Sequence, residues 1–470
     1  METLPELGVG IVYFPALEPL LEAGNVLIDT LEIEPQQYWI KHGDGFRLDD
    51  RAFDHISRFP QHKLVHGVGL PLAGSLGLDQ AQIDPFVESI QRLDPPWVSE
   101  HLAFLRAGQD QEIFNTGFLL PPLQSPETMA TAARNIRQLR SRIGRPLAFE
   151  NATNYLKPLP GEMADGQFLA GVAEQADCGM LLDLHNLWCN QLNGRQPVAE
   201  VLATIPLERV WELHLAGGDS HRGYWLDAHS GLVPEALMEL CRDLLPRLPH
   251  LKGVTFEIIP EYVTAKSIGI DALLGQLESI RALWDTRGRD VRCPRTPTAH
   301  DTIAVRGELP SQSDWERALG LAVNGRTARD GLQIPLSADP GVGVLQQLVT
   351  NVRAGMLVDL LTLSYRMLVL NLGESSTREL MEGYWLRHLP EPFAGQEARR
   401  FAGFVRDQDL PVAHLDDVLA YEIASIEALS RREEVRIDFK CDPLALIGAL
   451  QAGRHPGTLP QGRYELTIQP

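Results

Sequence analysis

Eight short apolar stretches alternate with segments of helical periodicity in the first part of the chain, and this alternation constrains the fold more than any other feature. Helical spacing is clearest at residues 126–143 and 234–245. Strands that alternate with helices pair in parallel through crossover helices, and eight such units predict an α/β fold, the (β/α)8 or TIM barrel. An open doubly wound sheet is the alternative, although such a sheet collects its ligands at one switch point. The stretches are residues 8–13, 30–34, 63–66, 97–101, 146–151, 179–186, 210–214 and 253–257.

Seven of these stretches end in an acid, a histidine or an asparagine, and the exception ends in Tyr13. A barrel enzyme has its active site at the carboxyl ends of its strands, so these side chains are expected to meet at one mouth. A lone histidine at a strand end is more often structural than a ligand. Several carboxylates and imidazoles converge in a dry mouth only around a cation, because isolated buried charges are costly. The predicted metal ligands are His66, His101, Glu150, Asp183, His214 and Glu257.

A second group of candidates adds to this set. Asp227 and His229 are two residues apart, so in extended backbone both point to one side, although a surface loop explains the pair equally well. Asp183 and His185 also share a face, which favours His185 over Asn186 as a ligand if the strand continues that far. Acids and imidazoles without thiolates suit iron, manganese or zinc. Further mouth candidates, for substrate binding, are Glu34 and Asn151.

Charge and cysteine content exclude several classes of protein. The net charge of -20, from 42 basic and 62 acidic residues, argues against a nucleic-acid partner, because such proteins neutralise phosphates with Lys and Arg. Five cysteines without a Cys-x-x-Cys pair fit a reducing compartment. The N-terminus has no signal-like segment, and no stretch reaches about 18 uninterrupted apolar residues. We therefore expect a cytoplasmic protein without a membrane partner.

The length of 470 residues predicts two domains, because single cores stop growing at roughly 250 to 300 residues. We expect the barrel domain at residues 1–284, a linker rich in Arg, Pro and Thr at 285–310, and a mostly helical domain at 311–470. Two strands, 435–439 and 463–468, close that domain. Its expected helices are 315–321, 343–352, 357–372, 376–388, 396–407 and 415–429.

Several strand-end motifs resemble those of the multinuclear non-heme iron-dependent oxidative enzymes, which belong to the xylose-isomerase-like and endonuclease IV-like barrel superfamily and modify peptide natural products. The resemblance covers about residues 8 to 285. The motifs are Ser99-Glu-His-Leu-Ala-Phe104, Phe149-Glu-Asn-Ala-Thr153, Leu182-Asp-Leu-His-Asn186, Glu212-Leu-His-Leu-Ala-Gly217 and Thr255-Phe-Glu-Ile258.

This resemblance implies two or three iron ions, with a mixed-valent Fe(II)/Fe(III) pair and dioxygen as co-substrate. Its reaction is the oxidation of a cysteine in a ribosomally made precursor peptide. The resemblance implies the following sites: a first iron at His66, His101 and Glu150; a second at Asp183, His214 and Glu257, bridged by Glu150; and a third at Asp227, His229 and either Asn186 or His185. The catalytic residues it implies are Glu150, Asp183, His214 and Glu257.

Residues 351–424 resemble the helical region of the partner proteins that capture the leader of the precursor. A fusion of this kind would make a separate partner protein unnecessary. The two terminal strands would then offer an edge to which a leader peptide adds as another strand. The alternative is a structural domain or one that forms homo-oligomers.

Two other enzyme classes share parts of this ligand set. A zinc-dependent phosphodiester hydrolase of the endonuclease IV type activates water on the metal, but it needs a basic surface for DNA, which the acidic balance opposes. A sugar isomerase uses two divalent ions and a lysine near the mouth. Lys63 and Lys252 lie at strand starts, which is the opposite end.

Overall fold

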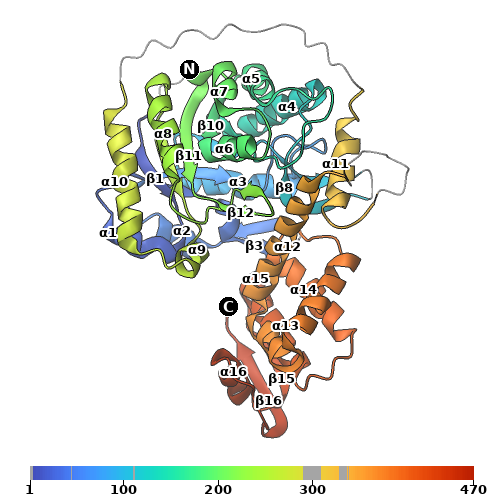
Figure 1. Ribbon diagram of the computed structural model, residues 1–470. Helices are drawn as coiled ribbons and strands as arrows, with labels where there is room; N and C mark the ends of the chain where they lie inside the picture. Colours follow the sequence, from blue (N-terminus) through green and yellow to red (C-terminus); the bar gives the residue numbers. More distant parts are fainter. Residues whose placement is uncertain (1–3, 44, 109–111, 289–307, 328–335, 337) are drawn as a thin grey trace.

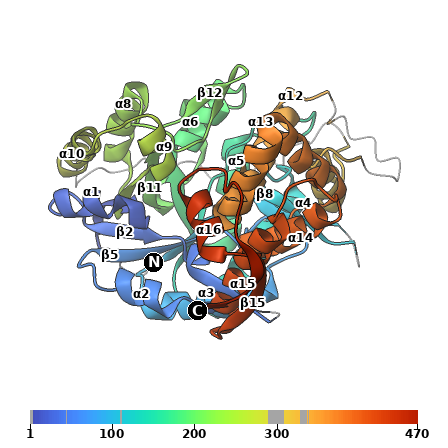
Figure 2. The same ribbon diagram turned by 90° about the horizontal axis from the view of Figure 1, so that it is seen from below.

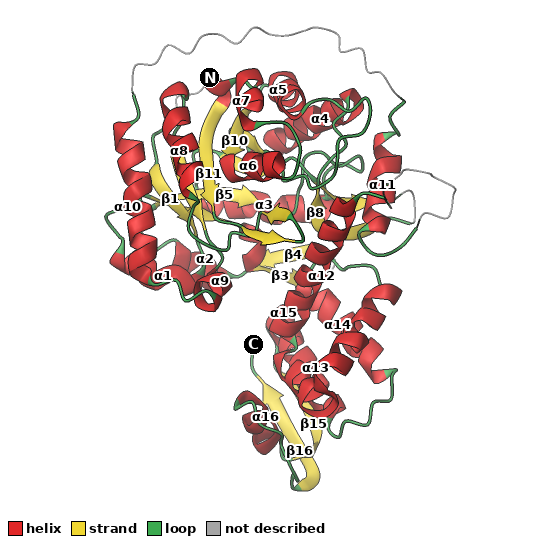
Figure 3. Cartoon of the chain, viewed as in Figure 1, coloured by secondary structure: helices red, strands yellow, loops and turns green. Residues whose placement is uncertain are grey.

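Eight parallel strands form a closed barrel, which confirms the predicted TIM-barrel fold (Figures 1 and 3). The computed structural model describes residues 4–43, 45–108, 112–288, 308–327, 336 and 338–470. Around the barrel, each strand pairs with the next barrel strand along the chain, and the last pairs with the first. The strands are β1 (Gly8–Val12), β2 (Thr30–Ile33), β5 (His62–Gly67), β6 (Val98–His101), β9 (Leu147–Glu150), β10 (Gly179–Asp183), β11 (Val210–Ala216) and β14 (Gly253–Glu257).

The barrel strands are buried on both faces, as parallel strands covered by helices are. Every residue of β1, β2, β9, β10 and β14 is buried. The helices between them are α1 (Glu18–Ala23), α2 (Asp50–Ile56), α3 (Gln80–Leu93), α4 (Pro126–Ile143), α5 (Asp165–Ala176), α6 (Leu184–Leu192), α7 (Val198–Thr204), α8 (Glu235–Leu244), α9 (Pro260–Ala265) and α10 (Ile270–Thr286), with 3-10 turns at Pro15–Leu17, Pro35–Tyr38, Leu207–Arg209 and Leu245–Arg247.

Local sequence explains why α4 forms where the periodicity predicts it. The Ser125 hydroxyl caps the first turn by accepting from the Thr128 N–H at 3.1 Å, and Pro126 occupies the first position, where no N–H is needed. Gly144 ends the helix with a φ of +63°, a conformation that glycine adopts without strain. The predicted helix at 126–143 is therefore confirmed, and α8 corresponds to the predicted helix at 234–245.

Three antiparallel hairpins follow barrel strands at their carboxyl ends and so border the mouth. The first follows β2, the second follows β6 and the third follows β11. They consist of β3 (Trp39–His42) with β4 (Gly45–Leu48), β7 (Phe104–Ala107) with β8 (Phe114–Leu120), and β12 (Asp219–His221) with β13 (Tyr224–Leu226).

The rest of the chain is helical with one small hairpin, as predicted. Its elements are α11 (Gln312–Ala322), α12 (Pro340–Leu360), α13 (Thr362–Arg387), α14 (Ala394–Arg406), α15 (Leu415–Arg431), β15 (Val435–Cys441), α16 (Pro443–Gln451) and β16 (Gln461–Ile468). The helix α16 is an addition to the predicted set. Most of the predicted linker, residues 289–307, lies outside the described residues.

The helix α12 joins two hydrophobic cores, and Figure 1 shows it running from the barrel into the C-terminal unit. Its first half shares a cluster with α11 and the β7–β8 hairpin, where Leu345 and Val349 pack with Trp315, Phe104 and Leu120. Its last turn belongs to the core of the C-terminal helices. We use the name C-terminal unit for residues 353–470.

The predicted helix at 357–372 does not exist as one piece. Helix α12 ends at Leu360, and α13 departs from it at an angle of 102°. The Glu422 carboxylate of α15 accepts from the Leu363 and Ser364 N–H groups at 2.7 and 3.0 Å, and so caps the start of α13. A tertiary contact therefore supplies the break. A second break lies at Gly373, whose φ is +82°.

The C-terminal unit contacts the barrel at the hairpins of the mouth, and Figure 2 shows it in front of one half of the barrel. The rings of Phe46 and Phe393 lie 4.2 Å apart between centroids. Arg47 Nη2 donates to the Leu429 carbonyl at 2.6 Å, and Arg432 pairs with Asp50. The unit is therefore positioned beside the opening of the barrel.

Within the described residues, no individual helix has the length and hydropathy needed to cross a membrane. Helices α12 and α13 meet the requirements of length and hydropathy only when taken together across their bend.

Glu316 of α11 fixes this helix to the barrel and predicts a pH-dependent stability. Its carboxylate accepts from the Ser75 N–H at 2.9 Å and from Gln312 Nε2 at 2.7 Å. Burial raises the pKa of Glu316 to about 7, although Ser75 and Gln312 oppose the shift. A carboxyl with a raised folded pKa loses its contribution to stability as the pH rises from its unfolded pKa through its folded pKa.

We therefore expect the unfolding free energy to fall by about 3 kcal/mol more in the wild type than in Glu316→Gln between pH 4.5 and 7. The glutamine keeps an acceptor oxygen but does not ionise. Urea unfolding of both proteins at pH 5, 6, 7 and 8 measures the difference. An identical pH profile for the two proteins contradicts the assignment.

Candidate metal centre

His66, His101 and Glu150 meet at the carboxyl ends of β5, β6 and β9. The Nε2 atoms of both histidines lie 3.1 Å from Glu150 Oε2. His101 Nδ1 is 3.0 Å from the Gly67 carbonyl oxygen, which only accepts, so the ring hydrogen of neutral His101 is on Nδ1 and the lone pair of Nε2 faces the carboxylate. Two such atoms approach to this distance only with a proton or a cation between them.

Histidine and carboxylate shift each other's pKa in this group. Burial lowers the pKa of His101, but the charges of Glu150 and Glu100 outweigh burial and raise it to about 10. Burial raises the pKa of Glu150, and His101 and His66 reverse the effect and lower it to about 2. A positive charge is thus favoured between these side chains.

Two further clusters at the ends of β9, β10, β11 and β14 extend the first, and a third joins Glu32 of β2 to His214 and Glu257. Donor atoms of Glu150, Asp183 and His214 all lie within 4.8 Å of one another, as do those of Asp183, His229 and Glu257. His214 Nδ1 is 3.2 Å from Glu257 Oε1, and His229 Nε2 is 3.4 Å from Glu257 Oε2. The clusters share members, so they form one continuous centre.

Asp227 lies at the outer side of this centre. Its Oδ1 is 3.0 Å from His229 Nε2 and 2.9 Å from His185 Nδ1. The Thr153 hydroxyl contacts Asp227 Oδ2 at 3.3 Å and also donates to Asn186 Oδ1. Asn186 and His185 therefore flank the same carboxylate.

The strand β10 ends at Asp183, so the condition for preferring His185 is not met. Asp183 is the N-cap of α6, and its Oδ1 accepts from the Asn186 N–H at 2.8 Å. His185 Nε2 accepts from Trp225 Nε1 at 3.1 Å while Nδ1 faces Asp227, so both ring nitrogens have partners. Asn186 Nδ2 instead lies 3.4 Å from Glu150 Oε1.

Several donor atoms at the centre have no hydrogen-bond partner in the described structure and face only other members of the centre. Most of the centre's carboxylates pair with histidines, but Asp183 has no ion-pair partner of this kind among the described residues. Burial raises the pKa of Asp183 well above its ordinary value, and the charges of Glu257, Asp227 and Glu150 add to the effect. The chemistry of this donor set fits metal ions. Buried atoms without a hydrogen-bond partner in the described structure are Glu150 Oε2, Asp183 Oδ2, His214 Nδ1, His229 Nε2 and Glu257 Oε2.

Asn151 and Glu34, the two residues predicted to bind substrate at the mouth, lie outside these clusters. Asn151 bridges two strands, because its Oδ1 accepts from the Asp183 N–H and its Nδ2 donates to the Asp183 carbonyl, each at 2.9 Å. Glu34 follows β2 and accepts from Gln37. Asn151 thus holds Asp183 in place, while Glu34 remains partly exposed at the mouth.

Several residues around the centre were not among the sequence candidates. Glu32 contacts His214, and Thr153 and Trp225 contact the Asp227 group. Glu32 could have been recognised from the sequence, because an acid inside a fully buried strand is rarely structural and so indicates a functional role. Thr153 and Trp225 could not, since hydroxyl and indole groups in loops and hairpins are common.

The geometry agrees with a comparison of the sequence with known families. A model described as RiPP precursor modification enzyme MbnB/TglH/ChrH matches residues 8–264, more than half of the chain. The chain belongs to this family. RiPP denotes a ribosomally synthesised and post-translationally modified peptide, so the chain is a member of a family of RiPP precursor modification enzymes. The C-terminal unit lies outside the matched residues.

Relatives of this RiPP enzyme carry the name UPF0276 protein. One from Caulobacter vibrioides is 28% identical over 272 residues, which cover 57% of this chain and 91% of the relative. One from Pseudomonas aeruginosa is 32% identical over 225 residues, or 48% of this chain and 75% of the relative. One from Streptomyces avermitilis is 32% identical over 250 residues, or 53% of this chain and 50% of the relative.

Similar solved structures include the xylose isomerase domain protein from Planctomyces limnophilus, at 14% identity and a TM-score of 0.39, covering 60% of this chain and 97% of the other. A D-psicose 3-epimerase is 11% identical with a TM-score of 0.37, covering 58% of this chain and 96% of the other.

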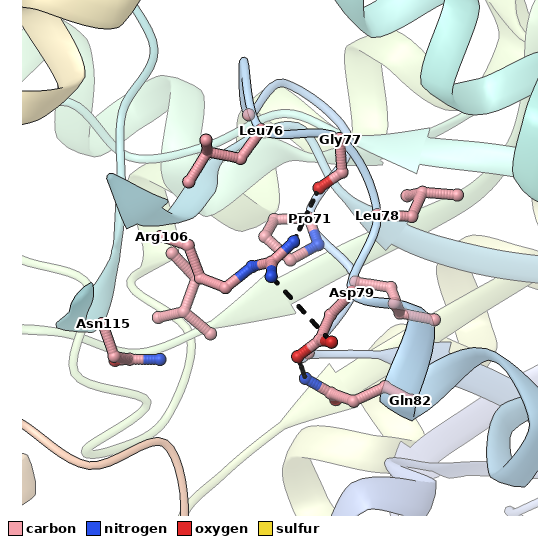
Figure 4. A pocket seen from close by; sticks show the side chains of 12 residues that line it. Pro71, Leu76, Gly77, Leu78, Asp79, Gln82, Arg106 and Asn115 are labelled. Atoms are coloured by element: carbon pink, nitrogen blue, oxygen red, sulfur yellow. Dashed lines mark hydrogen bonds and ion pairs between the residues drawn. The ribbon is translucent and has the colours of Figure 1, made fainter. Parts of the chain in front are cut away.

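A small pocket lies beside the mouth, between the loop after β5 and the β7–β8 hairpin (Figure 4). Arg106 Nη2 donates to the Gly77 carbonyl at 3.1 Å, and Nη1 lies 3.9 Å from Asp79 Oδ1. Asp79 in turn caps α3 by accepting from the Ala81 N–H at 3.2 Å. Arg106 therefore ties a hairpin of the mouth to a loop and to the start of a barrel helix.

Asp183→Asn is expected to change stability with opposite signs in metal-free and metal-loaded protein. The asparagine keeps the cap of α6 and removes a carboxyl whose raised pKa lowers the stability of the metal-free protein at neutral pH. The metal-free variant should therefore gain about 1 to 2 kcal/mol. It should lose most of the stabilisation that bound metal gives the wild type. Thermal unfolding with and without added Zn²⁺ measures both effects. Equal stabilisation of the two proteins by Zn²⁺ contradicts a ligand role for Asp183.

Proposed function

We propose that this RiPP enzyme is a dioxygen-dependent multinuclear iron oxidase that modifies cysteine residues of a precursor peptide. The observation that carries the proposal is the continuous group of histidines and carboxylates at the barrel mouth, whose inward atoms are buried and face only one another. Buried donors of this kind are stable only when a cation binds them. The family relationship supplies the class of substrate.

The donor groups suggest how two or three ions would be held. His66, His101 and Glu150 would hold the first, and Asp183, His214 and Glu257 the second, with Glu150 between them. Asp227 and His229 would hold a third together with Asn186 or His185, which both lie beside Asp227. When bound, a mixed-valent iron pair supplies redox chemistry with dioxygen and a position for a substrate thiolate.

The residues of the centre support a thiolate that comes from the substrate. Cys189 is the cysteine beside the centre, with its Sγ 3.6 Å from His185 Nε2. Burial raises the pKa of Cys189 well above its ordinary value, and Asp227 and Asp183 add to this effect, so it stays a neutral thiol. The four described cysteines are free thiols.

The C-terminal unit is suited to present the precursor. It contacts the β3–β4 hairpin through Phe393 and the start of α2 through Arg432, and Pro390 packs on Gly117 of β8. A leader bound to this unit would therefore place the following peptide near the mouth. The β15–β16 hairpin offers sheet edges for strand addition.

The test uses full-length protein purified without oxygen from iron-supplemented cells, together with a cysteine-containing precursor peptide encoded beside it. We expect two to three irons per chain, a coupled mixed-valent pair in Mössbauer spectra, and a precursor mass change that requires dioxygen. Replacing the precursor cysteines by serine should abolish the change. Stoichiometric zinc without iron, and an unchanged peptide, would favour a metal-dependent hydrolase instead.

A further inference from the structure

Glu32 places a carboxylate inside the barrel, one layer below the proposed metal centre. It is the third of the four residues of β2 and has no exposed surface. The interior of such a barrel is normally filled by branched aliphatic side chains, because a buried charge costs several kcal/mol unless it is well paired. A residue of this kind at this place indicates a role for its carboxylate.

The partner of Glu32 is His214, across the barrel on β11. Glu32 Oε2 lies 3.1 Å from His214 Nε2, and both side chains are fully buried. When Glu32 is ionised its carboxylate only accepts, which places the ring hydrogen of His214 on Nε2. The other ring nitrogen, Nδ1, is then a lone-pair donor, and it lies 3.2 Å from Glu257 Oε1 on the side of the mouth.

His214 is turned in the opposite sense to the other two histidines of the centre. His66 and His101 face Glu150 with Nε2, and their Nδ1 atoms contact Ser99 Oγ at 2.8 Å and the Gly67 carbonyl at 3.0 Å. Those two contacts lie in or next to the strands. Among these three histidines, only His214 has its inner ring nitrogen next to a carboxylate from a strand across the barrel.

A second carboxylate, that of Glu212, lies near the inner side of His214. Glu212 lies 3.8 Å from His214 Nε2. Its own oxygens accept from Trp97 Nε1 and from Thr255 Oγ1, each at 3.0 Å. Glu212 is therefore committed to other donors, and Glu32 remains the direct acceptor for His214.

We infer that Glu32 is a positioning residue that holds His214 with its hydrogen on Nε2, so that Nδ1 binds metal in the proposed centre. The inference rests on the metal centre of the proposed function and adds the residue that sets which nitrogen binds. A carboxylate that accepts from the distal ring N–H fixes the tautomer and the orientation of a metal-binding histidine, and losing it typically weakens metal binding about 10- to 100-fold.

The test uses the full-length chain stripped of metal and reloaded with Zn²⁺, a diamagnetic probe. Long-range proton–nitrogen correlations of histidine labelled with nitrogen-15 distinguish protonated from metal-bound ring nitrogens, and His214→Gln assigns the signals. We expect His214 to show a protonated Nε2 and a metal-bound Nδ1, and His101 the reverse. A metal-bound Nε2 on His214 overturns the inference whatever the variants do.

Zn²⁺ affinity, measured by competition with a chelator, supplies the second readout. E32L should bind Zn²⁺ about 10- to 100-fold more weakly. E32D moves the carboxylate away from His214 and should also bind Zn²⁺ more weakly, so it provides the test if E32L does not fold. E32Q keeps an acceptor oxygen and should retain most of the affinity. T30V is the matched control, because it removes a buried hydroxyl from the same strand, one that donates to the Leu7 carbonyl and contacts neither His214 nor Glu212. It should resemble the wild type.

Two failures are distinguishable. If His66 and His101 bind Zn²⁺ but E32L and E32D keep wild-type affinity, Glu32 has no positioning role and the metal centre stands. If no histidine of the wild-type protein binds metal, the proposed centre itself is wrong and this inference falls with it.

Discussion

Glu150→Gln is expected to purify with less than about a tenth of the wild-type metal and to lose precursor modification by about a thousandfold. Glu150 belongs to two of the donor clusters, one with His66 and His101 and one with Asp183 and His214. Its loss should therefore affect two ions at once. The amide keeps the volume and can still accept from Asn186, so the fold should persist. Metal analysis by mass spectrometry and peptide turnover measure the two effects.

Glu34→Gln is the matched control for this variant. Glu34 also lies at the carboxyl end of a barrel strand, but it accepts from Gln37 and belongs to none of the donor clusters among the described residues. It should keep the wild-type metal content. Equal metal in Glu150→Gln and wild type would remove Glu150 from the centre.

A chain that ends at residue 352 is expected to bind metal like the full chain but to modify a full precursor about a hundredfold more slowly. This end keeps the whole cluster that Leu345 and Val349 form with the barrel hairpin. It removes the C-terminal unit, whose proposed leader binding raises the effective concentration of the peptide at the mouth. The rate constant kcat/KM for the precursor measures the loss.

The control for this truncation is a core peptide without its leader, which both proteins should modify at the same slow rate. A chain that ends at residue 288 should behave differently, because it removes Trp315 and Leu319 and exposes Phe104, Leu120 and Tyr155. Such an apolar patch favours aggregation. Full activity of the 352-residue chain on the precursor would exclude a presenting role for the C-terminal unit.

The barrel was predictable because its signals are local. Parallel strands buried on both faces are near-continuous apolar runs, and α4 carries its cap, its first-turn proline and its terminal glycine within its own segment. The polar strand ends followed from the same pattern. Once the barrel is known, His66, His101, Glu150 and Asp183 must lie at one mouth.

The C-terminal helices were less predictable at their ends. Residues 357–372 have continuous helical spacing, and the break after Leu360 depends on Glu422, which lies far along the chain and caps Leu363 and Ser364. The periodicity of a segment cannot reveal a cap that comes from another helix.

The sequence by itself determined which residues form the barrel strands and which polar side chains end them, because both depend on neighbours along the chain. The tertiary structure alone decided which atom of each of these side chains faces the metal centre. His185 is engaged by Trp225 on a distant hairpin, and His214 is oriented by Glu32, 182 residues away. Hydrogen bonds between buried groups form only when the barrel closes, so no local pattern records them.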